Sequence, residues 1–176
     1  MNACKETQTG YIRCLREMET SSEDLAGQEQ VRVFESVREA AEFLSTTEGK
    51  ILITTGSKEL KEYTKIGNYQ ERCFARVLST KAAMEESVRL GFEGKHLIAM
   101  QGPFSEEMNL ALLHQTRARY FVTKESGKAG GFEEKLKAAK KAGAVLIVIG
   151  RPQERGRSVQ EVCHFIESNF GKKEQE

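Results

Sequence analysis

Glycine, hydroxyl and cationic residues follow five apolar runs in this 176-residue chain. Glycine lets backbone N–H groups come close to a ligand, hydroxyl groups donate hydrogen bonds, and lysine or arginine pairs with carboxylates and phosphates. This combination predicts a binding rim for an anionic, oxygen-rich ligand. The candidate binding residues are Thr54, Thr55, Gly56, Ser57, Gln101, Gly102, Pro103, Ser105, Thr123, Ser126, Gly127, Lys128, Gly130, Gly131 and Arg151.

The longest of these segments, Thr123–Gly131, contains three glycines and the lysines Lys124 and Lys128. Such a segment can turn several N–H groups and the N-terminus of the next helix toward one anion. It matches neither the G-x-x-x-x-G-K-[ST] nor the G-x-G-x-x-G phosphate-binding motif. A flexible connector is the alternative interpretation here, and plain strand–helix turns are the alternative at the other strand ends.

The elements that position these residues are short β-rich runs that alternate with helical patterns from residue 31 onward. Several runs are apolar on consecutive residues, as in strands that are buried on both faces. The expected strands are 31–34, 50–54, 73–78, 96–100, 119–123 and 144–149. The alternation predicts an α/β fold, a Rossmann-like parallel sheet of five or six strands with helices on both faces. In such sheets, ligands bind outside the carboxyl ends of the strands.

Helix signals lie between the strands. Ser36-x-x-Glu39 and Ser158-x-x-Glu161 are capping boxes, and each predicts the start of a helix. Met84 and Val88 form an apolar stripe that ends at Gly91. The last helix is expected to pack its apolar face on the core, with Val159, Val162, Cys163, Ile166 and Phe170.

Three ranges differ in character. Residues 1–30 are polar and are expected to be the remnant of a preceding domain or a linker. Residues 31–170 are expected to form the α/β domain, and residues 171–176 a solvated tail.

Composition excludes several classes of protein. Lys and Arg total 27 against 26 Asp and Glu, so the protein has no strong positive electrostatic field that would attract nucleic acid or an anionic membrane. No apolar run approaches the roughly 20 residues of a membrane span, and no signal peptide is recognisable, so we expect a cytoplasmic protein. The cysteines form no C-x-x-C pair and the histidines lie far apart, which argues against a disulfide framework, a metal site or a Cys/His catalytic site.

Four segments resemble the sequence blocks of the precorrin-6A reductase family of cobalamin biosynthesis, in that family's order and spacing. Gly-Pro-Phe-Ser and Thr-Lys-x-Ser-Gly-x-x-Gly-Gly are together fairly specific. The resemblance covers about residues 45–152, with weaker similarity at Tyr11-Ile-Arg13. The segments are Ile51-Leu-Ile-Thr-Thr-Gly-Ser-Lys58, Ile98-Ala-Met-Gln-Gly-Pro-Phe-Ser-Glu106, Val122-Thr-Lys-Glu-Ser-Gly-Lys-Ala-Gly-Gly-Phe132 and Val148-Ile-Gly-Arg-Pro152.

The resemblance implies reduction of one ring double bond of precorrin-6A or cobalt-precorrin-6A by NADPH, with a hydride added to one carbon and a proton to its neighbour. The tetrapyrrole substrate carries many carboxylates, which suits the expected rim. Lys124 is then the first candidate for a clamp on a carboxylate or phosphate, and also a candidate proton donor. Ser57, Gln101 and Ser126 are candidate orienting hydrogen-bond donors.

Members of that family are longer and begin with a strand, a Gly-rich turn and Glu-Gly-Arg, which form part of a first Rossmann-like domain. This chain therefore resembles the second domain with a stub of the first, and we expect it to be inactive in isolation without that missing N-terminal domain. Two alternatives remain open at this stage. One is a non-catalytic tetrapyrrole- or nucleotide-binding domain, and the other is a tetrapyrrole lyase similar to uroporphyrinogen-III synthase.

Overall fold

The computed structural model describes residues 2–15, 30–125, 131–150 and 156–170. The chain divides into two compact units. The sheet unit is Thr20–Arg151, and the terminal unit combines Met1–Glu19 with Pro152–Glu176. The expected range of 31–170 for the α/β domain includes the last helix, which this division groups with the N-terminal segment.

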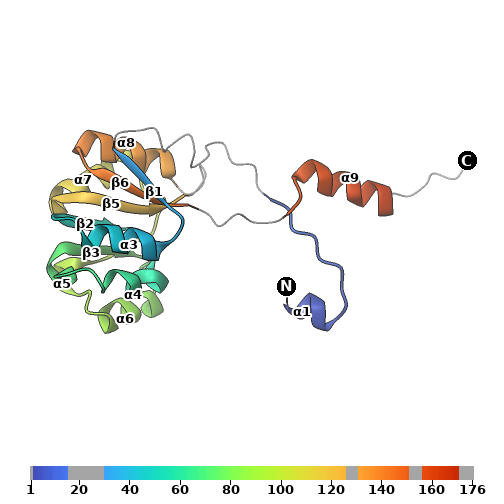
Figure 1. The fold of residues 1–176 in the computed structure, drawn as a ribbon, viewed down its shortest axis with the longest axis horizontal. Helices are drawn as coiled ribbons and strands as arrows, with labels where there is room; N and C mark the ends of the chain where they lie inside the picture. Colours follow the sequence, from blue (N-terminus) through green and yellow to red (C-terminus); the bar gives the residue numbers. More distant parts are fainter. Residues whose placement is uncertain (1, 16–29, 126–130, 151–155, 171–176) are drawn as a thin grey trace, which may run out of the picture. The chain divides into compact units, whose positions relative to one another are not determined.

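The sheet unit is built on six parallel strands in the order β1-β6-β5-β2-β3-β4 (Figure 1). The strands are β1 (Val31–Phe34), β2 (Lys50–Ile53), β3 (Cys73–Val77), β4 (Leu97–Ala99), β5 (Ala118–Lys124) and β6 (Val145–Ile149). All six expected strands are confirmed within two residues at each end. The central strands are buried on both faces, which explains why their sequences are apolar on consecutive residues.

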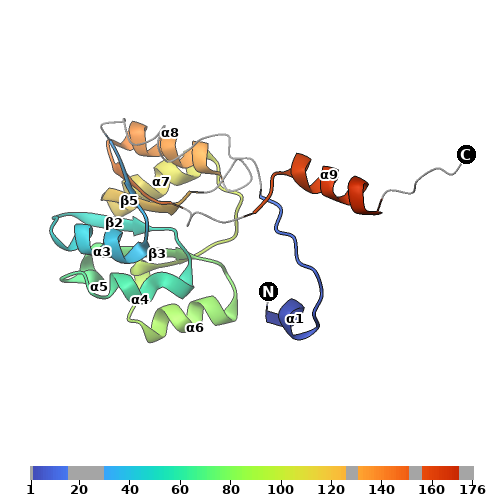
Figure 2. The ribbon, with the colours of Figure 1, turned by 45° about the vertical axis from the view of Figure 1, so that its right-hand side comes forward.

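Helices cover both faces of the sheet (Figure 2). On one face, α3 (Val37–Ser45), α4 (Leu60–Tyr63), α5 (Tyr69–Arg72) and α6 (Lys81–Arg89) pack over Ile51, Ile53 and their neighbours. On the other face, α7 (Glu106–Thr116) and α8 (Phe132–Ala142) pack over Leu52, Phe121 and Leu146. Two short 3-10 turns, η1 (Ser57–Glu59) and η2 (Gly94–His96), complete the unit. The expected fold class, an α/β parallel sheet with helices on both faces, is confirmed.

The capping signals act as expected. The Ser36 hydroxyl accepts a hydrogen bond from the Glu39 N–H at 3.2 Å, and the Glu39 carboxylate accepts one from the N–H of Glu35. The prediction from the Met84–Val88 stripe, in contrast, is wrong, because these two side chains are not on the buried face of α6. Both side chains are more than a third exposed, and the small residues Ala83 and Ser87 are buried instead. Small side chains face inward here because α6 packs closely against η1.

In the terminal unit, α1 (Asn2–Glu6) and α9 (Val159–Phe170) flank a parallel bridge between Cys14 and Arg157. The Ser158–Glu161 capping box is present at the start of α9. The expectation that the apolar face of α9 lies in a core is wrong, because none of its described side chains is buried. Among the described residues, no helix has the length and apolar character of a membrane span.

Candidate functional site

The strand order fixes where a ligand can bind. β2 and β5 are neighbours in the sheet, but the chain continues from β2 toward β3 and from β5 toward β6, in opposite directions. The connections therefore leave a crevice at the carboxyl ends of these two strands, which is the usual ligand position in open α/β sheets.

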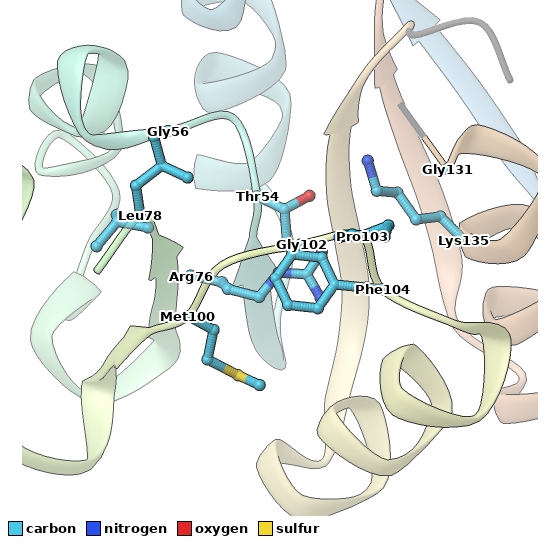
Figure 3. Close-up of a pocket in the computed structure, with 11 residues that line it drawn as sticks. Thr54, Gly56, Arg76, Leu78, Met100, Gly102, Pro103, Phe104, Gly131 and Lys135 are labelled. Atoms are coloured by element: carbon cyan, nitrogen blue, oxygen red, sulfur yellow. The ribbon is translucent and has the colours of Figure 1, made fainter. Parts of the chain in front are cut away.

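A cavity of about 510 Å³ lies at this edge (Figure 3). This volume is typical of small-molecule sites. Five residues expected from the sequence contribute to its wall, and they come from the segments after β2 and β4 and from the start of α8. The lining residues are Thr54, Gly56, Arg76, Val77, Leu78, Met100, Gly102, Pro103, Phe104, Gly131 and Lys135.

Arg76 is the most deeply buried cation of the cavity, with 5% of its surface exposed. It lies on β3 on the side that faces α7, and its Nη1 donates a hydrogen bond to Oδ1 of Asn109 at 2.8 Å. The guanidinium carbon is 3.9 Å from the centre of the Phe104 ring, a cation–π contact. Burial lowers the pKa of Arg76 to about 10, so it stays charged at neutral pH.

The surroundings of Arg76 hold its guanidinium in one orientation. Asn109 is fully buried on α7, and its Nδ2 donates to the backbone oxygen of Ser105 at 2.8 Å. Ser105 itself caps α7, because its hydroxyl accepts from the N–H of Met108. Gly102 allows the Phe104 ring to lie close, since a Cβ at this position would stand 3.1 Å from a ring carbon.

Lys135 is the second cation of the cavity and projects from α8 (Figure 3). Its ammonium donates a hydrogen bond to the hydroxyl of Thr123 on β5 at 3.1 Å. Burial lowers the pKa of Lys135 to about 8, and the positive charge of Arg76 adds to this shift, while Glu134 opposes it. The ammonium therefore titrates within about a unit of neutral pH.

The start of α8 also faces the cavity. Gly131 is its N-cap, with φ of 64° in the left-handed region that favours glycine, and no side chain caps the helix there. The first N–H groups of an α-helix carry partial positive charge. Two cations and one helix N-terminus therefore meet at a cavity whose remaining wall is largely apolar.

The other expected residues lie in different surroundings. Lys124, the first candidate from the sequence, is absent from the described cavity wall and pairs with Glu59 at 2.7 Å. Thr55 is buried and within hydrogen-bond distance of the Tyr63 hydroxyl. Ser57 begins η1, Gln101 is exposed, and Thr123 is buried beneath Lys135. The expected residues outside the described ranges are Ser126, Gly127, Lys128, Gly130 and Arg151.

Sequence reasoning missed Arg76 and Lys135, although each carries a signal. Arg76 stands inside the run Cys73-Phe-Ala-Arg-Val77, where a charge is costly to bury and so is rarely incidental. Lys135 follows Phe132 by three residues, so it lies on the core-facing side of the helix rather than on the solvated side. A cation inside an apolar sequence pattern therefore indicates this site more specifically than the glycine and hydroxyl residues at the strand ends do.

A family model described as precorrin-6x reductase CbiJ/CobK matches residues 1–167. The chain belongs to this family. Curated relatives named cobalt-precorrin-6A reductase come from Priestia megaterium, 37% identical over 172 residues, and from Methanothermobacter thermautotrophicus, 38% identical over 156 residues. The alignments cover 94% and 87% of this precorrin-6x reductase family chain, but only 66% and 49% of the two relatives.

A solved structure named CobK precorrin-6A reductase matches with a TM-score of 0.66 and 18% identity. The match covers 97% of this chain and 67% of that one. At this identity the match shows a shared fold. No group of three or more His, Cys, Asp or Glu side chains suited to a metal ion occurs within the described ranges of this precorrin-6x reductase family member.

Proposed function

We propose that this chain takes part in the NADPH-dependent reduction of a ring double bond of precorrin-6A or cobalt-precorrin-6A, in cobalamin biosynthesis. One observation carries the proposal, together with membership of the family. The cavity at the β2–β5 switch point combines an apolar wall with a buried arginine, Arg76, and a partly buried lysine, Lys135. A macrocycle with carboxylate side chains, and a dinucleotide with phosphates, both present apolar faces and oxyanions.

The lining residues fit such ligands by type. Leu78, Met100 and Phe104 offer apolar surface for the flat face of a ring. Gly56 and Gly102 carry no side chain, so a large ligand can approach the backbone at two strand ends. Arg76 and Lys135 supply charge-assisted hydrogen bonds to phosphate or carboxylate oxygens.

NADPH supplies the hydride when it is bound, and the protein has to orient it against the macrocycle. In this chain, Arg76, Lys135 and the N-terminus of α8 are the groups that would hold its phosphates. The apolar wall excludes water from the face of a bound ring. Of the described lysines, Lys135 is the one whose lowered pKa suits proton donation near neutral pH, whereas Lys124 is held by Glu59.

The chain spans between about half and two thirds of the length of the curated relatives that it matches. We propose that it contributes one side of the ligand-binding cleft. Holding two reactants in place is commonly worth an effective molarity on the order of 10⁵ M or more. One side of a cleft forfeits much of this advantage, so we expect little turnover from the chain by itself.

The experiment measures NADPH oxidation with precorrin-6A and with cobalt-precorrin-6A. The chain is assayed alone, and then together with the part of the Priestia megaterium protein that the alignment leaves uncovered. We expect turnover in the mixture and little in the chain alone. Binding of both ligands without turnover in the mixture would favour the non-catalytic binding domain, and rapid turnover by the chain alone would contradict the one-sided cleft.

A further inference from the structure

We propose that the terminal unit is a docking surface for a second parallel sheet. In this arrangement α9 covers one face of that sheet, and the bridge between Cys14 and Arg157 continues into its edge. The occupant is the part of the longer family proteins that this chain does not span. That sheet would supply the other side of the ligand-binding cleft, and in this respect the docking surface rests on the proposed function.

Large apolar side chains are exposed more often in the terminal unit than in the sheet unit. Nine such side chains are more than a third exposed among the described residues, and five of them belong to the terminal unit, although the sheet unit is much the larger. The five are Tyr11, Ile12, Val159, Ile166 and Phe170, of which Phe170 is 74% exposed. Exposed apolar groups that gather in one region usually mark a contact with another protein surface.

The apolar residues of α9 form one stripe along the helix. Val159, Cys163, Ile166 and Phe170 follow one another at intervals of four, three and four residues, so they share one side of α9. All four side chains are exposed, and the opposite side of the helix carries Glu161 and other polar residues. A helix of 12 residues takes most of its stability from packing of its apolar side. This stripe is therefore built to be covered, and the described part of the terminal unit does not bury it.

The bridge has the backbone pairing of a parallel sheet. The N–H of Leu15 donates to the Arg157 carbonyl at 2.8 Å, and the N–H of Arg157 donates to the Arg13 carbonyl at 2.9 Å. In the described part of the chain, no third strand pairs with either segment. An isolated pair of strands is marginal in water, and parallel pairs belong to sheets that helices cover. Because α9 begins two residues after Arg157, a further strand beside this pair would complete a sheet with α9 over one face.

The longer family proteins contain a segment that can supply this sheet. The match to the solved structure covers 97% of this chain, which is more than the sheet unit provides, so the shared fold includes residues of the terminal unit. The match covers 67% of that other chain, and the alignments cover 66% and 49% of the two curated relatives. Each of these proteins therefore has a long further segment, and that segment is the occupant.

A second copy of this chain fits the surface less well. With 12 residues, α9 is about 18 Å long and about 10 Å wide. Two such helices packed face to face cover far less than the roughly 800 Å² that each partner of a stable interface buries. A sheet that lies beneath α9 and also pairs with the bridge adds backbone hydrogen bonds to the apolar contact. The second copy is therefore an outcome for the experiment to detect.

The native cysteines report on the docking surface without any substitution. Cys163 lies on the apolar stripe of α9 and is exposed, whereas Cys73 is buried in the sheet unit. The experiment measures the rate at which N-ethylmaleimide alkylates each thiol, by peptide mass spectrometry, in this chain alone and in a full-length chimera. The chimera is the Priestia megaterium protein with its aligned region replaced by this chain. Val88→Cys, on the exposed side of α6, provides the matched control thiol in both proteins.

We expect Cys163 to react at least about tenfold more slowly in the chimera than in the chain alone, because the occupant excludes the reagent from the stripe. The thiol of the Val88→Cys variant should react equally fast in both proteins. Cys73 should stay unreactive in both, which shows that the sheet unit is folded. Ile166→Glu places a charge on the stripe and should restore the fast reaction of Cys163 in the chimera. In the chain alone it should leave the urea midpoint unchanged, since Ile166 is half exposed there.

Equal reaction rates of Cys163 in the chain and in the chimera would overturn the docking surface. A rate in the chain alone that falls as the protein concentration rises would also overturn it, because a second copy would then cover the stripe. The proposed function fails separately. A chimera that protects Cys163 but does not reduce the macrocycle would keep the docking surface and reject the reductase.

Co-expression is the second measurement, for the case in which Cys73 becomes reactive because the chimera does not fold. This chain should copurify with the part of the Priestia megaterium protein that the alignment leaves uncovered. Ile166→Glu should abolish the copurification, and Val88→Glu on α6 should not. Failure of the wild-type chain to copurify, or equal copurification of the two variants, would overturn the docking surface.

Discussion

Two regions at the same edge of the sheet each hold a lysine, but in opposite electrical surroundings. At the rim, Lys124 is half exposed and forms an ion pair with Glu59. In the cavity, Lys135 lies beside a second cation, Arg76. The rim pair is neutral as a unit, whereas the cavity wall brings two cations together. A cation that already pairs with a carboxylate at 2.7 Å, as Lys124 does, is less available to a ligand.

The comparison also separates two kinds of energetic contribution. Exposed ion pairs contribute about 0 to 1 kcal/mol to stability, because water screens them. A buried cation depends on every hydrogen bond that it makes, because the surrounding protein solvates it poorly. Changes at the rim should thus be mild, and changes around Arg76 and Lys135 should be large.

The largest effect is expected from Asn109→Leu. This substitution keeps the volume but leaves the buried guanidinium of Arg76 without its acceptor, and it removes the donor to the Ser105 carbonyl. The free energy of unfolding should fall by about 2 to 4 kcal/mol. Urea denaturation gives the value, with Glu59→Gln at the rim as the control that should lose less than about 1 kcal/mol. Equal losses in the free energy of unfolding for the two variants would contradict the proposed difference between the cavity and the rim.

The next effect concerns pH. Lys135 has a pKa of about 8 in the folded chain against an ordinary 10.5 when unfolded. Between pH 8 and pH 10.5 the unfolded chain binds more protons than the folded chain, so the free energy of unfolding rises with pH. Below pH 8 this increase in the free energy of unfolding is absent. We expect Lys135→Met to be more stable than the wild type at pH 7 by about 1 to 2 kcal/mol, and the difference to shrink toward pH 10.5. Thermal or urea unfolding at several pH values measures it, and a difference that does not vary with pH would place the lysine in solvent.

A smaller effect is expected from Gly102→Ala. The added Cβ would stand 3.1 Å from the Phe104 ring, so the ring has to shift away from the Arg76 guanidinium. Affinity for the anion that binds the cavity should fall by about threefold, with a loss of stability below about 1 kcal/mol. Gly67→Ala, where no atom lies within 4 Å of the new Cβ, is the matched control. Calorimetric titration should find no change in that control.

The smallest effect is expected at Lys124. In the wild type, Lys124→Ala should change anion affinity by less than threefold, because Glu59 already neutralises the ammonium. In a Glu59→Gln background the lysine loses its carboxylate, and the same substitution should then weaken binding more. A large loss from Lys124→Ala in the wild type would restore the rim as the principal anion site.

Much of the fold follows from sequence because local signals and tertiary packing agree. The consecutive apolar residues of β2 and β6 are buried on both faces, and Ser36 and Ser158 start the helices that they cap. The face of α6 was misassigned because apolar character alone does not decide which side packs. Ala83 and Ser87 are small enough for close packing against η1, and this requirement outweighs the greater apolar area of Met84 and Val88.

Some of the expected site residues line the cavity, but the two cations of its wall were not expected from the sequence. Gly56, Gly102 and Gly131 line the cavity because strand ends place them there. The distant pairing of Lys124 with Glu59, and the approach of Lys135 to Arg76, depend on how separate elements meet across the sheet. No local pattern encodes such contacts. The charge inside the apolar run of β3 was the stronger of two sequence signals for the cavity, because Lys135 is marked only by its spacing from Phe132.

The parallel bridge between Cys14 and Arg157 joins segments from opposite ends of the sequence. While the chain between them is unfolded, such a contact carries a large loop-closure entropy. Folding of the sheet unit, Thr20–Arg151, fixes those intervening residues and removes much of this entropy. We therefore expect the sheet unit to fold first and the bridge to form second. During synthesis on the ribosome, Cys14 then stays without its bridge partner until Arg157 has emerged.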